Sequence, residues 1–235
     1  MHGAAITYAW VHGWAICRST PAPVPEPWGY RIDVGLPHQL FRHVLPESDE
    51  VAVRALCEDI SEPGAWLKVL GRPEEVAGWI TPGWSVPDDP GFMMFTELRA
   101  TTAPALPEGY VRETTTRDGV LLVRVLAADG TLAARGRMAP TGTTAVVDRI
   151  ETYPGHRRRG RVVMRTLETA GAEAGARTGV LAATTEGRAL YSALGWTYQG
   201  PLTGVVRDGA PVAPPAAPAA GRRLLPTGRA DGPSW

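Results

Sequence analysis

The sequence predicts an α/β protein in which a mixed, mostly antiparallel twisted sheet is flanked by helices and two similar halves follow in tandem. Residues 145–196 read as a strand, an arginine-rich turn, a helix, a second strand and a second helix. Residues 30–97 show a similar alternation of strands and helices without that turn. Residues 110–154 contain four extended segments separated by turn signals, which is typical of an antiparallel meander.

The charge of the chain is balanced, which excludes some classes of partner. Among 235 residues, acidic and basic side chains number 24 each, so no overall field favours nucleic acid or a membrane surface. Lys68 is the only lysine, and this bias toward arginine, with many Ala, Gly and Pro residues, suggests a GC-rich bacterial genome. No long apolar run and no signal-peptide pattern occurs, so we expect a soluble, cytoplasmic protein.

The first thirty residues carry Trp10, Trp14 and Trp28 around a proline-rich stretch. Tryptophan buries a large area and proline interrupts regular hydrogen bonding, so we expect a short strand or helix followed by an extended arm packed on the body. Cys17 and Cys57 show neither a CxxC spacing nor neighbouring histidines. They are therefore expected to be reduced structural residues, and no metal site is predicted.

The first half, residues 1–97, follows a regular order of elements. We expect strands at 30–35, 42–45, 65–71 and 91–98, and helices at 49–60 and 72–80. The second of these helices has Pro73 at its first position with two glutamates behind it, as helix starts favour. No basic, glycine-containing turn occurs here, so we expect a degenerate half without the ligand site of the second.

Composition marks the other boundaries of the chain. Residues 98–109 are rich in Thr, Ala and Pro and predict a linker to the second half, 110–207. From 208 to 235 proline and alanine dominate. Such a tail buries too little apolar surface to offset its ordering entropy, so disorder is predicted there.

The arginine-rich turn is the first candidate for a binding site. Five arginines lie between positions 157 and 165, and the run HRRRG joins a strand to a helix. The first backbone N–H groups of a helix have no internal partners, and the helix dipole favours negative charge there. The turn therefore predicts an anion site for a phosphate-bearing cofactor.

The block VVDRIETYPGHRRRGRVVMRTLE, followed by GVLAAT, EGRALYSALGW and a final GPL, resembles the GNAT superfamily of acyl-CoA-dependent N-acetyltransferases. The likeness covers roughly residues 110–206. Two elements make it specific: the arginine turn between strand and helix, and the LYSALGW segment downstream. The resemblance implies the GNAT fold, acetyl-CoA as co-substrate, and direct transfer of an acetyl group to a primary amine of a small molecule or peptide.

The resemblance also implies where coenzyme A would bind. In this family the strand before the turn splays from its neighbour, and its free backbone groups pair with the pantetheine arm. Ile150, Glu151 and Thr152 would take that position here. The pyrophosphate would lie on the helix N-terminus. The residues implied at the turn are Arg157, Arg158, Arg159, Gly160, Arg161 and Val162.

Tyr191 stands where the family presents a tyrosine that protonates the departing thiolate. A phenol with a pKa of about 10 stays protonated at neutral pH and can donate to a thiolate; the competing role is packing under the acyl arm. For the base that removes the amine proton, we favour Glu151 over Asp148, and a salt bridge to Arg149 or another arginine competes with that role. The two carboxylates are three positions apart, so regular extended geometry places them on opposite faces.

The turn departs from the family pattern Q/R-x-x-G-x-G/A. If Gly160 is the first glycine, Val162 replaces the second; if Gly160 is the second glycine, two residues are missing. Valine would restrict the backbone and project a branched side chain at the phosphates, and a shorter loop would offer fewer N–H donors. The alternative function is therefore a GNAT-fold pseudoenzyme or binding module with weakened CoA binding.

The second half also lacks the two helices that normally follow the first strand of such a domain. We expect the first half to cover that side of the site, with Trp28, Trp66 or Trp84 as the wall for the acceptor. A third hypothesis gives the first half a structural role, as a domain interface or as the interface of a homodimer. Balanced charge favours no one class of amine.

Overall fold

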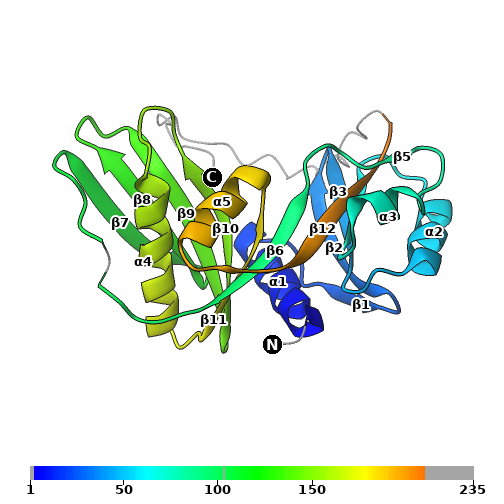
Figure 1. Cartoon of the computed structure of the whole chain (residues 1–235), viewed down its shortest axis with the longest axis horizontal. Helices are drawn as coiled ribbons and strands as arrows, with labels where there is room; N and C mark the ends of the chain where they lie inside the picture. Colours follow the sequence, from blue (N-terminus) through cyan, green and yellow to red (C-terminus); the bar gives the residue numbers. More distant parts are fainter. Residues whose placement is uncertain (1–2, 103, 210–235) are drawn as a thin grey trace, which may run out of the picture.

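The computed structural model describes residues 3–102 and 104–209 and shows two lobes of sheet and helix (Figure 1). The first lobe contains β1 (Val24–Glu26), β2 (Gly29–Leu36), β3 (Gln39–Leu45), α2 (Glu50–Asp59), β4 (Ala65–Val69), α3 (Pro73–Ala77) and β5 (Trp84–Ser85). The second contains β7 (Tyr110–Arg117), β8 (Val120–Ala127), β9 (Leu132–Thr141), β10 (Thr144–Thr152), α4 (Arg159–Glu173), β11 (Thr178–Ala183) and α5 (Thr185–Ala193). Three elements lie between the lobes: α1 (Gly3–Arg18), β6 (Gly91–Glu97) and β12 (Thr197–Arg207).

The expected elements form in both halves, and the N-terminal segment is a helix, α1, followed by the short strand β1. The tail expected to be disordered lies, apart from residues 208 and 209, outside the described residues. Cys17 and Cys57 are free and buried. Within residues 3–102 and 104–209, no helix combines the length and apolar character needed to span a membrane.

One continuous sheet runs through both lobes, in the order β1-β2-β3-β4-β12-β6-β11-β10-β9-β8-β7. Most neighbours are antiparallel; the parallel pairs are β3 with β4 and β10 with β11. β12 joins the lobes, because its residues Thr197–Leu202 pair with β6 while Thr203–Val206 pair with β4. The fold class expected from the sequence, a mixed and mostly antiparallel sheet flanked by helices, is confirmed.

The lobes exchange strands. β6 ends the segment expected as the first half, yet it lies between β11 and β12 in the second lobe. The end of β12 in turn lies between β4 and β5 of the first lobe. Each lobe thus completes its sheet with a strand from the other part of the chain. We propose that the boundary expected at residue 97 divides the sequence but not the hydrogen-bonded sheet.

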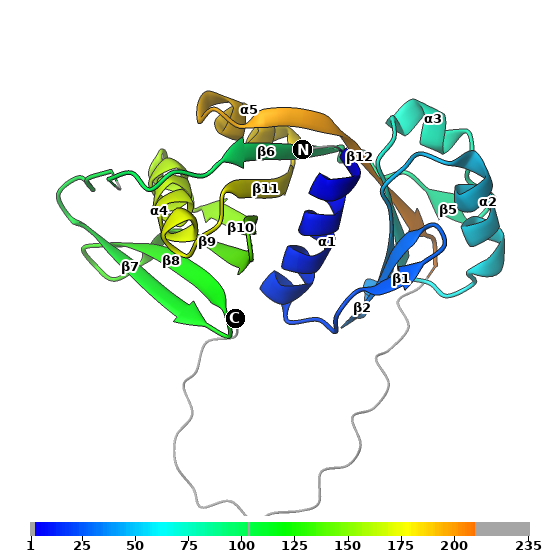
Figure 2. The same ribbon diagram turned by 90° about the horizontal axis from the view of Figure 1, so that it is seen from below.

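α1 lies between the two lobes, as Figure 2 shows from below. It is rich in apolar residues, and most of its side chains are buried while Tyr8 and Ile16 stay exposed. Its residues Ile6, Trp10 and Val11 pack in one cluster with Val44 of the first lobe and Val146 of the second. α2 and α3 cover the outer face of the first lobe, and α4 and α5 pack on the face of the second lobe away from α1. α1 therefore fills the space that the two sheets share.

Candidate active site

The candidate site opens where two parallel strands of the second lobe separate. β10 pairs with β11 only at its start, with Thr144–Val146 beside Thr178–Val180. β10 then continues to Thr152 along β9 alone. Among residues 3–102 and 104–209, the backbone groups on its other edge therefore have no strand partner beyond Val146. In the first lobe, β3 and β4 stay paired through Phe41–Leu45, so these two strands do not separate.

In the part of the chain that the structure describes, no side chain caps the N-terminus of α4. Arg158 is the N-cap residue, with a φ of 70° in the left-handed region, and its side chain makes no capping hydrogen bond. The N–H groups of the first turn and the helix dipole therefore favour an anion. The matching helix of the first lobe differs, because Asp49 caps α2 and accepts hydrogen bonds from the N–H groups of Val51 and Ala52. An anion at that helix would meet a carboxylate.

A pocket of about 490 Å³ lies at the uncapped start of α4. Its lining comes from the end of β10, the turn, the start of α4 and one residue of α5: Thr152, Tyr153, Pro154, Gly155, Arg157, Arg158, Gly160, Arg161 and Leu190. Three arginines and free helical N–H groups around one cavity suit a phosphorylated ligand. Five of the nine residues implied for cofactor binding thus line this pocket. The other four, Tyr153, Pro154, Gly155 and Leu190, were not expected, and only their positions beside the turn and motif could have suggested them.

Gly160 lets α4 begin close to the end of β10. It is the second residue of the helix, and a Cβ there would lie 2.7 Å from Oγ1 of Thr152. A side chain at this position would separate the strand from the helix start. The glycine expected at the phosphate turn is therefore required by packing as well as by access to the backbone.

The other implied cofactor residues lie around the pocket in different settings. Ile150 packs against the core, and the Arg159 guanidinium lies 4.1 Å from the ring centroid of Tyr110. Val162 is 7% exposed and belongs to the core cluster beneath α4. The concern that its branched side chain projects at the phosphates was wrong, because the helix turns that side chain inward. As the fourth helical residue, its N–H is also the first with an intrahelical acceptor.

A β-bulge changes the faces of the two candidate bases. Asp148 pairs with Arg137 and Glu151 with Arg135, while the register shifts between them. Arg149 has a φ of 52°, the left-handed conformation of an inserted bulge residue. Because Arg135 and Arg137 are two positions apart, their partners lie on one face. The expectation that the two carboxylates face opposite sides was therefore wrong, since it assumed a regular strand.

Both carboxylates are paired with arginines. Glu151 accepts hydrogen bonds from Arg135 Nε at 2.9 Å and from the Tyr153 hydroxyl at 3.2 Å. Asp148 accepts from Arg18 Nε at 2.6 Å and from Arg18 Nη2 at 2.9 Å, a bidentate pair that ties β10 to the end of α1. The Asp148 side chain is only 11% exposed. The competing role foreseen for each residue, a salt bridge, is thus present, although not to Arg149.

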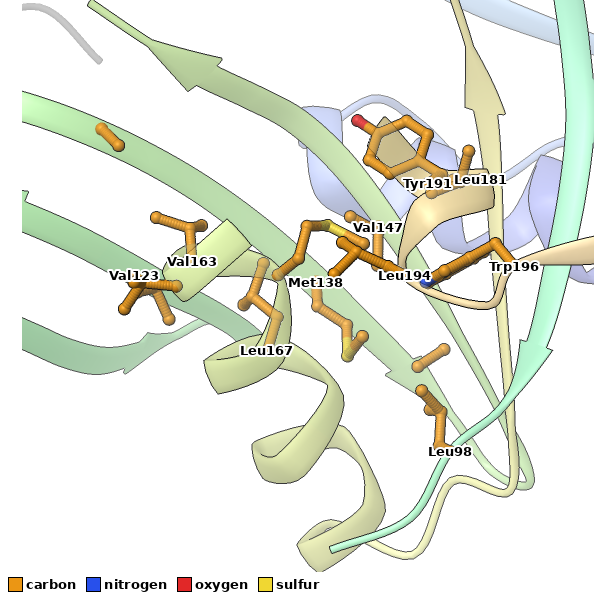
Figure 3. Close-up of a cluster of buried hydrophobic side chains, with 14 of the residues drawn as sticks. Leu98, Val123, Met138, Val147, Val163, Leu167, Leu181, Tyr191, Leu194 and Trp196 are labelled. Carbon is orange, nitrogen blue, oxygen red and sulfur yellow. The ribbon is translucent and has the colours of Figure 1, made fainter. Parts of the chain in front are cut away.

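Tyr191 lies at the edge of the core with its hydroxyl directed away from Leu194 and Trp196 (Figure 3). The residue is 8% exposed, and its ring centroid is 6.1 Å from that of Trp196. Burial, helped by the nearby charge of Asp148, raises the pKa of Tyr191 to about 12. Its phenol is therefore fully protonated at neutral pH.

A second pocket, of about 180 Å³, lies on the α1 side of the separating strands. Trp10 and Trp14 of α1 form part of its wall. The expected wall was wrong: Trp28 and Trp84 pack in the outer core of the first lobe, and Trp66 donates its indole N–H to the His38 carbonyl. Sequence reasoning missed α1 because nothing local shows where a helix will dock. Its richness in apolar residues was the available signal.

No family model and no curated protein matches the sequence. Among solved structures, a GCN5-related N-acetyltransferase from Kribbella flavida superposes with a TM-score of 0.58 over 89% of this chain and 97% of its own, at 15% identity. A GNAT-family protein from Novosphingobium aromaticivorans gives 0.52 over 86% and 96%, at 16% identity. A GCN5-related N-acetyltransferase from Sphaerobacter thermophilus gives 0.50 over 63% and 61%, at 13% identity. Because the first two extend across both lobes, the whole described chain, and not its second lobe alone, has the fold of the GCN5-related N-acetyltransferases.

Proposed function

We propose that the protein is an N-acetyltransferase that moves an acetyl group from acetyl-CoA to a primary amine by direct attack. The observation that carries the proposal is the opening between β10 and β11, which ends at an uncapped, arginine-lined helix N-terminus. A strand edge without partners suits amide-rich pantetheine, and the turn suits its pyrophosphate. This combination is found in the second lobe and not in the paired strands and carboxylate-capped helix of the first.

The residues present fit coenzyme A. Arg157, Arg158 and Arg161 would hold phosphate oxygens, with the N–H groups of Gly160 and Arg161 at the helix start. The free edge of β10 at Ile150–Thr152 would orient the pantetheine arm. Bound acetyl-CoA supplies an acetyl thioester, whose carbon–sulfur bond breaks as an amine nitrogen bonds to the carbonyl carbon.

Tyr191 would act as the acid. Its phenol carries the proton at neutral pH, and the departing thiolate would take that proton as the carbon–sulfur bond breaks. Asp148 would hold the acceptor's amino group while paired with Arg18, because Asp148 lines the α1-side pocket and Glu151 does not. The amine's proton would leave to water beside these carboxylates. No covalent enzyme intermediate is required.

The reason for considering a pseudoenzyme is weakened. That alternative rested on damage to the phosphate turn by Val162 or by a shortened loop. Val162 faces the core, and the turn still brings three arginines to the pocket. We therefore propose the enzyme, and make the pseudoenzyme an outcome of the test.

Isothermal titration of the full chain with acetyl-CoA tests the proposal. We expect micromolar binding, weakened at least tenfold in Arg157→Gln/Arg161→Gln and unchanged in the control Arg99→Gln/Arg117→Gln, which removes two exposed arginines elsewhere. Thiol release with a panel of amines then reports transfer. Absence of acetyl-CoA binding by the wild-type protein would refute the enzyme, and binding without transfer to any amine would favour the pseudoenzyme.

A further inference from the structure

Charged side chains line the α1-side pocket, where the acceptor would bind. It lies where β10 and β11 have just separated, since Val147 and Asp148 follow the last residue of β10 that pairs with β11, and the facing residues 182–184 are the end of β11 and the N-cap of α5. The first lobe contributes Arg42 and Lys68 to the opposite side. The pocket thus places the first lobe's cations across from the point where the thioester would emerge.

Arg42 and Lys68 occupy the inner face of the first lobe's sheet. Alternate residues of β3 and β4, such as Phe41, Leu45 and Leu67, pack in the outer core under α2 and α3. Arg42 and Lys68 have the other parity, and the register of β3 with β4 pairs Arg42 with Trp66 and Val44 with Lys68. The two cations are therefore diagonal neighbours on the face that looks toward α1.

Arg42 is deeply buried, with 8% of its surface exposed. Its guanidinium carbon lies 4.1 Å from the ring centroid of Trp14 and 5.9 Å from that of Trp10. The amide oxygen of Gln39, in the orientation its surroundings favour, accepts from Nε at 3.2 Å and from Nη2 at 2.6 Å. Burial lowers the pKa of Arg42 to about 9, so the group remains cationic at neutral pH. A neutral amide and two indole rings orient this charge without cancelling it.

Lys68 is the only lysine of the chain and lies 4.8 Å from the ring centroid of Trp66. Burial, with the charge of Arg42, lowers the pKa of Lys68 to about 7, and Asp89 opposes the shift. Within residues 3–102 and 104–209, no carboxylate approaches Arg42 or Lys68 within the 4.0 Å of an ion pair. The other charged residues of the pocket are Asp89, whose carboxylate acts on Lys68 from beyond ion-pair distance, and Arg18 and Asp148, which pair with each other. Among the described residues, neither the buried Arg42 nor the half-buried Lys68 is thus held by a carboxylate in an ion pair, so both side chains can bind an anionic group that enters the cavity.

We propose, on the basis of the acetyltransferase function above, that the acceptor is a small amine whose other end carries an anionic group, a carboxylate or a phosphate. Arg42 and Lys68 hold the anion, and Trp10 and Trp14 enclose the body of the molecule. The amino group lies at the Asp148 end, beside the separated strands. The pocket then binds both ends of a zwitterion, since Arg42 and Lys68 lie on β3 and β4 whereas Asp148 lies on β10.

The single lysine allows a binding test that needs neither acetyl-CoA nor turnover. Protein labelled with ¹³C at the lysine ε-carbon gives one lysine signal, from Lys68. Three probes of similar length are titrated: β-alanine with a carboxylate, 2-aminoethyl phosphate with a phosphate, and propylamine with neither. We expect a saturable shift of the signal, and a rise of the Lys68 ionisation midpoint, with one or both anionic amines and not with propylamine. Equal responses to all three would overturn the proposal. The anionic probe that binds more strongly shows whether the anionic group is a carboxylate or a phosphate.

Acetyl transfer provides the second readout. Lys68→Met should raise the KM of the better anionic amine at least tenfold with little change for propylamine, and Lys68→Arg should restore much of the loss. Arg31→Gln, on the neighbouring strand β2 and outside the pocket, is the matched control. The test does not depend on Arg42→Met. If that variant fails to fold, the KM values of the two Lys68 variants still show whether the cations hold the anionic end of the amine. A Lys68→Met enzyme with an unchanged KM for the anionic amine would overturn the proposal.

The two proposals fail in different ways. If acetyl-CoA does not bind but the Lys68 signal responds only to anionic amines, the anion pocket stands and the acetyltransferase falls. If acetyl-CoA binds and propylamine is acetylated as well as β-alanine and 2-aminoethyl phosphate, the acetyltransferase stands and the anionic acceptor falls.

Discussion

Burial raises the pKa of Tyr191 and lowers that of His43, and each residue supports a prediction at the scale of one side chain. In Tyr191 → Phe only the hydroxyl is lost, so the ring keeps its packing against Trp196. We expect kcat to fall by about 10²-fold, because the departing thiolate loses its proton donor, while acetyl-CoA affinity changes little. Stopped-flow thiol release and calorimetry measure the two quantities.

Tyr198→Phe is the control for this variant. Tyr198 is 41% exposed and its ring lies on the Arg188 guanidinium, a contact that phenylalanine keeps. Unaltered turnover in the Tyr191 variant would remove that residue from the mechanism and leave it a packing role.

His43 predicts how stability depends on pH. It is 4% exposed and accepts a hydrogen bond from the Trp28 indole at 3.3 Å, and burial lowers its pKa from 6.5 to about 4. Between these values the unfolded chain binds a proton that the folded protein does not, so stability present above pH 6.5 is lost on acidification toward pH 4. The loss amounts to about 3 kcal/mol. Denaturant unfolding of His43→Gln should show a shallower loss than wild type or His38→Gln; an identical slope would contradict this assignment.

Residue identity alone could predict Tyr191, Gly160 and the arginines of the turn, because a local motif contains them. It could not predict the common face of Asp148 and Glu151. That arrangement depends on one backbone angle at Arg149, which is set by the register with β9. A bulge adds one residue without leaving a compositional signal, so alternation counted along the strand gave the wrong face.

At the scale of elements, the contact between β10 and the first turn of α4 is the junction to test. In Gly160→Ala a new Cβ would lie 2.7 Å from Thr152 Oγ1, so strand and helix must move apart. We expect a loss of roughly 1–3 kcal/mol in the free energy of unfolding and weaker acetyl-CoA binding. Adding Thr152→Ala should restore part of the stability. Additive effects in this double-mutant cycle would show that contact between the Cβ at position 160 and Thr152 is not what destabilises the junction of β10 and α4.

Most elements followed from local patterns. Helix α3 begins at Pro73 as expected, and α2 begins one residue after its Asp49 cap. The two-residue strand β5 was missed, because it exists only through its pairing with the end of β12. Elements that are defined by a distant partner carry no periodicity of their own.

At the scale of the molecule, the exchange of strands predicts that the halves depend on each other. A fragment of residues 98–209 would lack β6, which separates β11 from β12, and α1, which covers the inner face. We expect this fragment to show neither cooperative unfolding nor acetyl-CoA binding, and mixing it with residues 1–97 to restore some of both. Circular dichroism and calorimetry test this, and a cooperatively folded, active fragment would contradict it.

The tandem arrangement could be predicted, because the two halves show a similar order of strands and helices in the sequence. Its consequences for the site could not. Trp10, Arg42 and Lys68 come from three elements of the N-terminal region and meet β10 only through the docking of α1 between the sheets. Such contacts depend on the complementarity of surfaces far apart in the chain, which local propensity does not record.

β12 gives the molecule a particular order of assembly during synthesis. The first lobe is made first, yet its sheet lacks the strand between β4 and β5 until residues 203–207 leave the ribosome. The edge of β4 stays exposed through that interval, and an open edge can pair with another chain. β12 therefore completes the sheets of both lobes late in synthesis, and it contributes Leu202 to the α1-side pocket.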